Sequence, residues 1–208
     1  MTQPLNLPDG YYELPKGKLA NVVTCLEMLS KPSMTDTSLP DGFALHRFTG
    51  ADMALFRTLF KAIGEDLMWF SRLFMADEKL AGILDNHHIE SYALYQNERP
   101  FGLMELNFVD MPNCELAFFG LTKDTIGLGL GRKLMNIAIS KAWEKPINRF
   151  WVHTCHFDHP SAVTFYKRSG FTPYSLMVEV HDDPRQTGHM AKTASPHVAL
   201  IEKELKIS

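Results

Sequence analysis

Three glycines stand close together in the segment IGLGLGRK at residues 126–133, directly before an apolar pattern of helical spacing. A glycine-rich turn at the start of a helix exposes several backbone N–H groups beside the positive end of the helix dipole. Such a turn binds anions, and phosphate above all. Arg132 and Lys133 would add positive charge to it. The segment therefore predicts a phosphate-binding loop.

Two common phosphate-binding motifs fit this loop poorly. The spacing of a Walker loop, GxxxxGK[ST], does not occur here. The dinucleotide fingerprint GxGxxG fails at its third glycine, because Arg132 stands at that position after Gly127 and Gly129. A glycine-rich helix start that holds no ligand remains the alternative.

One further motif follows the loop, and a glutamate precedes it. Residues 159–171, HPSAVTFYKRSGF, match the pattern NxxAxxFYxxxGF with His159 in place of Asn, and Glu115 lies fourteen residues before Gly129. The loop itself matches [QR]xxGx[GA], with Ile126 in place of Gln or Arg. With all three in order, residues 43–181 resemble the GNAT superfamily of acyl-CoA-dependent N-acetyltransferases.

This resemblance implies an α/β fold whose mixed, mostly antiparallel central sheet is flanked by helices and splayed at the coenzyme A cleft. It implies transfer of an acetyl group from acetyl-CoA to a primary amine of a small molecule or a peptide. The loop would hold the pyrophosphate, the pantetheine arm would pair like an added strand, and the N–H of Phe119 would be the oxyanion donor. The residues that the resemblance assigns to the cosubstrate are Phe119, Gly120, Leu121, Gly127, Leu128, Gly129, Leu130, Gly131, Arg132, Lys133 and His159. A domain that binds coenzyme A without transfer is the alternative.

Two carboxylates and a phenol are the candidates for proton transfer. Glu115 is the expected base, acting through water, and strand alternation predicts that it shares a face with Phe119 and Leu121. Glu105, on the neighbouring strand, is its rival. Tyr166 is the expected acid, because a phenol of pKa about 10 stays protonated at neutral pH. The structural alternatives are a solvated strand-end glutamate and a core tyrosine.

The acceptor side is expected in residues 51–86, which are unusually aromatic, although core packing explains most of those rings. Trp69 and Arg72 are the side chains predicted to enter the cleft. His153 and His156 are expected to line it from the next strand and turn. The spacing of the histidines with Cys155 matches no common zinc pattern, so no metal is predicted.

The elements that must position these residues follow from the pattern of the chain. Residues 1–42 are predicted to form an irregular arm with one additional element at residues 19–29, for which β-branched residues favour a strand. Residues 43–208 would form the acetyltransferase-like domain, with a capping box at residues 49–52. Residues 182–197 are predicted to be a loop, and either Asp158 or His159 is expected to cap the helix of Tyr166.

Composition narrows the class of protein further. The chain has 208 residues and a net charge of −3, which argues against nucleic acid as a partner. No apolar run approaches ~18 residues, and the first ten residues lack the features of a signal peptide, so no membrane segment is expected. Three cysteines do not form a disulfide framework and favour the cytoplasm. A homodimer is a further possibility, with residues 19–29 as a contact.

Overall fold

The computed structural model describes residues 7–33, 36–125 and 129–202. Its strands are β1 (Lys18–Met28), β2 (Phe43–Arg47), β3 (Ile89–Gln96), β4 (Arg99–Asn107), β5 (Asn113–Leu121), β6 (Arg149–Cys155) and β7 (Thr172–Asp182). Its α-helices are α1 (Met53–Gly64), α2 (Asp77–Leu84), α3 (Leu130–Ala142) and α4 (Ala162–Arg168). Short 3₁₀ turns at residues 50–52, 65–67 and 123–125 join some of them.

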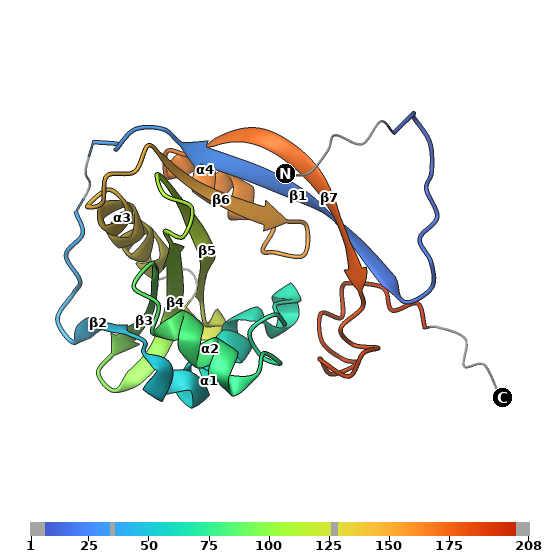
Figure 1. Ribbon diagram of the computed structural model, residues 1–208, viewed down its shortest axis with the longest axis horizontal. Coiled ribbons are helices and arrows are strands. Elements are labelled where there is room, and N and C mark those ends of the chain that lie inside the picture. Colours follow the sequence, from blue (N-terminus) through green and yellow to red (C-terminus); the bar gives the residue numbers. More distant parts are fainter. Residues whose placement is uncertain (1–6, 34–35, 126–128, 203–208) are drawn as a thin grey trace.

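The seven strands form one sheet in the order β2-β3-β4-β5-β6-β1-β7. All neighbouring pairs are antiparallel except β5 and β6, which are parallel. The expected α/β class and mixed, mostly antiparallel sheet are thus confirmed. The predicted strand at residues 19–29 is also confirmed, and it lies between β6 and β7 (Figure 1).

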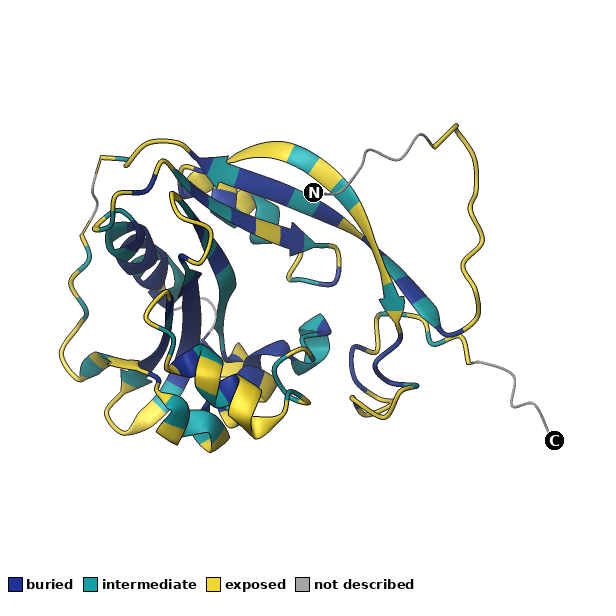
Figure 2. Ribbon diagram, viewed as in Figure 1, coloured by how far each residue is buried: buried dark blue, intermediate teal, exposed yellow. Residues whose placement is uncertain are grey.

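Two apolar cores lie on opposite faces of the sheet. Helix α3 covers β4 and β5 on one face, where Leu134, Met104 and Leu116 are buried. Helix α1 covers the other face, where Phe56, Phe60 and Leu103 are buried. The centre of the sheet is accordingly buried, whereas the edge strand β7 is largely exposed (Figure 2). The predicted capping box precedes α1, since the carboxylate of Asp52 accepts the N–H of Thr49 at 2.8 Å.

The segment after β7 contains no helix or strand over its described residues, 183–202, but it is held by a buried ion pair. Arg185 is 3% exposed and its Nη2 lies 2.7 Å from Oδ2 of Asp183. The same guanidinium donates to the carbonyl oxygens of Ala194, Val198 and Ala199. The expected loop is present.

Candidate active site

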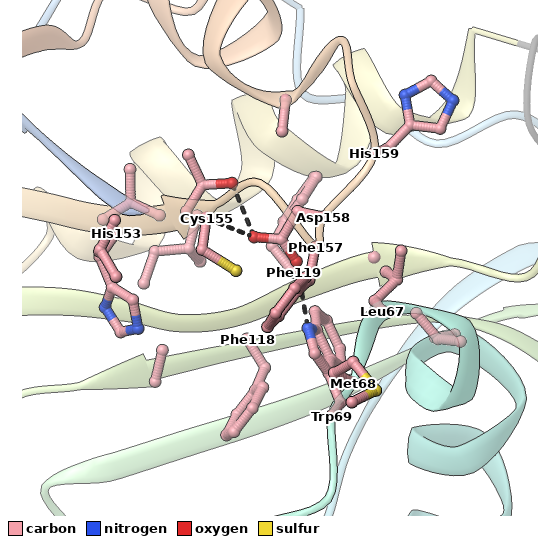
Figure 3. A pocket seen from close by; sticks show the side chains of 18 of the residues that line it. Leu67, Met68, Trp69, Phe118, Phe119, His153, Cys155, Phe157, Asp158 and His159 are labelled. Carbon is pink, nitrogen blue, oxygen red and sulfur yellow. Dashed lines mark hydrogen bonds between the residues drawn. The ribbon is translucent and has the colours of Figure 1, made fainter. Parts of the chain in front are cut away.

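The parallel strands β5 and β6 separate soon after they meet. They pair only at residues 113–115 and 149–151; beyond this, β5 continues beside β4 and β6 beside β1. Within the described strands, β5 therefore has no partner on its β6 side from Ala117 onward. A cleft of about 560 Å³ opens there, lined by both strands, by residues 67–72 and by residues 157–166 (Figure 3). The expected splay of the sheet is confirmed.

A β-bulge in β5 changes which side chains face the cleft. The pairing with β4 shifts between Glu105–Phe118 and Leu106–Leu116, so Ala117 is the extra residue. The bulge puts Glu115 on the same face as Phe118, while Phe119 lies on the opposite, α3 face. The prediction that Glu115 shares a face with Phe119 and Leu121 is therefore wrong, because strict alternation fails at a bulge.

Glu115 forms a pair with His153 across the separating strands. Its Oε1 lies 3.4 Å from Nδ1 of His153, and its Oε2 accepts a hydrogen bond from Nδ2 of Asn107 at 3.3 Å. The hydrogen bond to Glu115 raises the pKa of the His153 imidazole, and the charges of Glu115, Asp158 and Glu179 add to this effect. The imidazole of His153 therefore holds a proton more firmly than a free histidine does.

The rival carboxylate, Glu105, is occupied by other partners. It is 1% exposed and accepts hydrogen bonds from Nη2 of Arg72 at 2.6 Å and from Oγ of Ser91 at 2.7 Å. Arg72 also lies 5.2 Å from the centre of the Phe118 ring. Both oxygens of Glu105 are thus bound by side chains of the protein, whereas Glu115 borders the cleft, so this geometry favours Glu115 over Glu105. Arg72 lines the cleft as predicted, with its charge balanced.

Trp69 lies in the cleft and is tied to the opposite wall. Its Nε1 donates to Oδ1 of Asp158 at 3.3 Å, while Oδ2 of Asp158 accepts from Oγ1 of Thr154 and from the N–H of Cys155 (Figure 3). The ring packs 5.2 Å from that of Phe118. Asp158 therefore joins the segment after α1 to the turn after β6, and so holds two walls of the cleft together.

Two glycines permit this packing. A Cβ on Gly64 would lie 2.4 Å from Cβ of Trp69. A Cβ on Gly120 would lie 2.4 Å from Cγ2 of Ile63, so α1 approaches β5 only because this residue has no side chain. Both positions control how closely the helix and Trp69 approach the strand.

Tyr166 projects from α4 into the cleft. It is 7% exposed and lines the cavity together with Phe119 and Phe165, whose rings stack at 5.7 Å. Burial raises the pKa of the Tyr166 phenol, and the nearby charge of Asp158 raises it further, so the hydroxyl stays protonated. A buried phenol that borders a cavity can donate its proton to a group bound there.

The glycine loop reaches α3 with the geometry of a tight turn. Gly129 precedes the helix with φ of 75°, which favours glycine, and Gly131 lines the cleft. Leu130 is buried in the core on the α3 face. Gly127 and Leu128 lie outside the described residues.

The two cations after the glycines have other partners. Nη1 of Arg132 donates to Oγ of Ser169 at 2.8 Å and to the carbonyl of Arg168, which ties α3 to the end of α4. Nζ of Lys133 lies 3.5 Å from Oδ2 of Asp36 and donates to the carbonyl of Ser38. Both side chains thus form internal contacts, and their contacts with phosphate stay a prediction.

The two histidines after β6 differ in position. His156 accepts the backbone N–H of Val22 at 3.0 Å and lines a separate cavity with Leu19 and Phe157, so its predicted place in the main cleft is wrong. His159 borders the main cleft, and its Nδ1 accepts the N–H of Ser161 at 3.2 Å. The helix α4 begins after Ser161 with no side-chain cap, which corrects the expectation that Asp158 or His159 caps it.

Several cleft residues were not foreseen from the sequence. Asn107, Asn21, Glu179 and His181 line it. No motif or spacing in the sequence marks Asn21 and Glu179, because they meet only through the pairing of β1 with β7. The alternation of Glu105 and Asn107 along β4 could have placed Asn107 near Glu115, had the register of β4 and β5 been known.

Over the described residues, no three or more His, Cys, Asp or Glu side chains gather as a metal site. In the same residues, no helix has both the length and the apolar character needed to cross a membrane.

The sequence matches the profile of the Acetyltransferase (GNAT) family over residues 56–171, which is more than half of the chain. No curated protein sequence matches it.

Several solved structures share the fold at low sequence identity. A GCN5-related N-acetyltransferase from Sphaerobacter thermophilus aligns with a TM-score of 0.57 and 10% identity, over 78% of this chain and 52% of that one. A GNAT-family protein from Novosphingobium aromaticivorans aligns with a TM-score of 0.58 and 14% identity, over 83% of this chain and 70% of that one. An aminoglycoside acetyltransferase from an uncultured soil metagenomic sample, solved with trehalose, aligns with a TM-score of 0.52 and 16% identity, over 64% of this chain and 90% of that one. The chain covers 62%, 52% and 52% of the first three structures that it matches, so those proteins are considerably longer.

Proposed function

The chain belongs to the GNAT acetyltransferase family, and from this premise we propose that it transfers an acetyl group from acetyl-CoA to a primary amine. The acceptor in this proposal is a small molecule or a peptide. The similarity in fold to an aminoglycoside acetyltransferase supports an amine acceptor of the small-molecule class. The observation that carries the proposal is the separation of β5 from β6, with the Glu115–His153 pair on one wall and Tyr166 bordering the same cleft.

The residues present fit acetyl-CoA as the cosubstrate. The β5 segment from Ala117 to Leu121 offers backbone groups toward the cleft, to which an amide-bearing arm can pair like a strand. Gly129 and Gly131 open α3 at the same cleft, where helix N–H groups favour phosphate. Bound acetyl-CoA would supply an activated thioester carbonyl carbon to the amine.

Proton transfer is assigned to three side chains. The Glu115–His153 pair takes the proton of the incoming ammonium through water, so that the nitrogen lone pair becomes free to attack the carbonyl carbon. The pair passes this first proton to solvent, and as the C–N bond forms and the C–S bond breaks it takes the second proton of the nitrogen, which it later also releases to solvent. Tyr166 gives its phenolic proton to the departing sulfur and recovers one from solvent. The backbone N–H of Phe119 is the proposed oxyanion donor.

Two measurements test this function. Acetyl-CoA at millimolar concentration should raise the melting temperature of the protein, and a panel of primary amines should then release free thiol. Absence of a thermal shift would reject both the enzyme and the coenzyme A-binding alternative. A thermal shift with no thiol release from any amine would favour the binding domain without transfer.

A further inference from the structure

The wall formed by β1, β6 and β7 carries a carboxylate that the proposed reaction does not use. Glu179 on β7 lies opposite Asn21 on β1, and both line the cleft. Nδ2 of Asn21 donates to Oε2 of Glu179 at 3.0 Å, which orients the carboxylate. Among the described residues Glu179 forms no ion pair with a Lys or Arg, and the cationic group that its charge influences is the imidazole of His153.

Asn21 itself has an unused acceptor at this wall. The residue is 2% exposed, and its side-chain oxygen Oδ1 has no hydrogen-bond partner among the described residues. A buried amide oxygen without a donor is unfavourable unless a bound group supplies one. Both side chains therefore offer oxygen acceptors, and a cation with several N–H groups satisfies such a pair of acceptors.

The charge of the whole cleft favours a cationic ligand. Its lining carries Glu115, Asp158 and Glu179, whereas its arginine, Arg72, is neutralised by the buried Glu105. Three carboxylates thus line the cavity beside one compensated guanidinium and the imidazoles of three histidines, of which His153 is paired with Glu115. Such an excess attracts and orients a positively charged acceptor.

The spacing of the two ends can be worked from the sheet. His153 on β6 lies opposite Cys25 on β1, and Glu179 on β7 lies opposite Asn21 on β1. The two residues are therefore separated by four residues along the strands and by two strand spacings across the sheet. With about 3.3 Å per residue and 4.8 Å per strand, their backbones are about 16 Å apart. Both side chains line the cleft, so an acceptor that reaches both has to span a distance of this order.

We propose that Glu179, oriented by Asn21, binds a second ammonium group of the acceptor, which makes the acceptor a diamine or polyamine. This inference rests on the proposed function, because the Glu115–His153 pair serves the end of the acceptor that reacts. Glu179 then holds the end that does not react and determines acceptor specificity.

The test compares straight-chain monoamines with diamines of increasing length. In thiol-release assays we expect a diamine of matching length to have a KM about tenfold below that of the monoamine. Glu179→Gln should raise the diamine KM about tenfold, to near the monoamine value, and change the monoamine KM far less. Asp182→Asn, which removes the same charge from the opposite face of β7 near the end of the strand, is the matched control and should keep the preference.

Calorimetric titration of the same amines separates this inference from the proposed function, since it requires no turnover. Tighter binding of the diamine than of the monoamine, lost in Glu179→Gln, supports the second ammonium site even if no thiol is released. Equal binding of both amines by the wild type, or a preference that survives Glu179→Gln, overturns it.

Discussion

The hydrogen bond between Glu115 and His153 should set the protonation of the imidazole, and Glu115→Gln tests this. The substitution keeps the shape of the side chain and removes its charge. Because the Glu115 carboxylate is the largest cause of the raised pKa of His153, the pKa of the imidazole should fall in the variant. Titration of the His153 ring by NMR measures this change directly.

The same substitution should lower the rate of acetyl transfer. A positioned general base contributes about 10²- to 10⁴-fold, so we expect kcat/KM to fall at least about 100-fold at neutral pH. This corresponds to about 3 kcal/mol of lost transition-state stabilisation. Free-thiol release at saturating acetyl-CoA measures it.

Stability should change with pH in a defined direction. The pKa of His153 is raised in the folded state, so its pairing stabilises the protein fully below the unfolded pKa of about 6.5 and less as pH rises through the folded pKa. The melting temperature of the wild type should therefore exceed that of Glu115→Gln more at pH 5.5 to 6 than at pH 8 to 9. An unchanged His153 titration together with an unchanged rate would refute the assignment of this pair as the base.

Three further predictions concern other residues. Arg185→Leu leaves Asp183 buried without its partner, and should lower the free energy of unfolding by about 3 to 5 kcal/mol in urea titrations; a loss below 1 kcal/mol would contradict the role of this ion pair. Gly64→Ala places a Cβ against Trp69 and should cost about 1 to 3 kcal/mol of stability, whereas Gly82→Ala, where a Cβ meets nothing within 4 Å, should cost none. Tyr166→Phe should lower kcat about 100-fold with little change in melting temperature, and a retained kcat would exclude the phenol as the acid.

Local sequence patterns were enough to predict the strand character of β1, the capping box before α1 and the glycine turn before α3. Each of these depends on residues close together in the chain, where side-chain spacing and glycine content determine the backbone. The place of Glu115 at the cleft was implied by the resemblance to the family, in which a strand glutamate stands at this spacing before the loop.

Features that depend on pairing between distant segments could not be predicted. The bulge at Ala117 reversed the expected face of Phe119, because register is set by the neighbouring strand. The internal partners of Lys133 and Arg132 come from the linker before β2 and from the end of α4. Sequence alone could not favour Glu115 over Glu105 as the base, because it does not show that Arg72 forms an ion pair with Glu105.

Because β1 lies between β6 and β7, residues proposed to select the acceptor come from other parts of the chain than the residues that match the family profile. Residues 56–171, which match the family profile, contain Glu115, His153 and Tyr166. Asn21 and Glu179 lie outside that range, on β1 and β7, and reach the cleft only because β1 pairs with both β6 and β7. The matched region therefore carries the groups proposed for the transfer reaction, while the wall proposed to select the acceptor comes from segments near the two ends of the chain, which pair at one edge of the sheet. A change of side chain at these two positions should alter the preferred amine without moving the reacting groups.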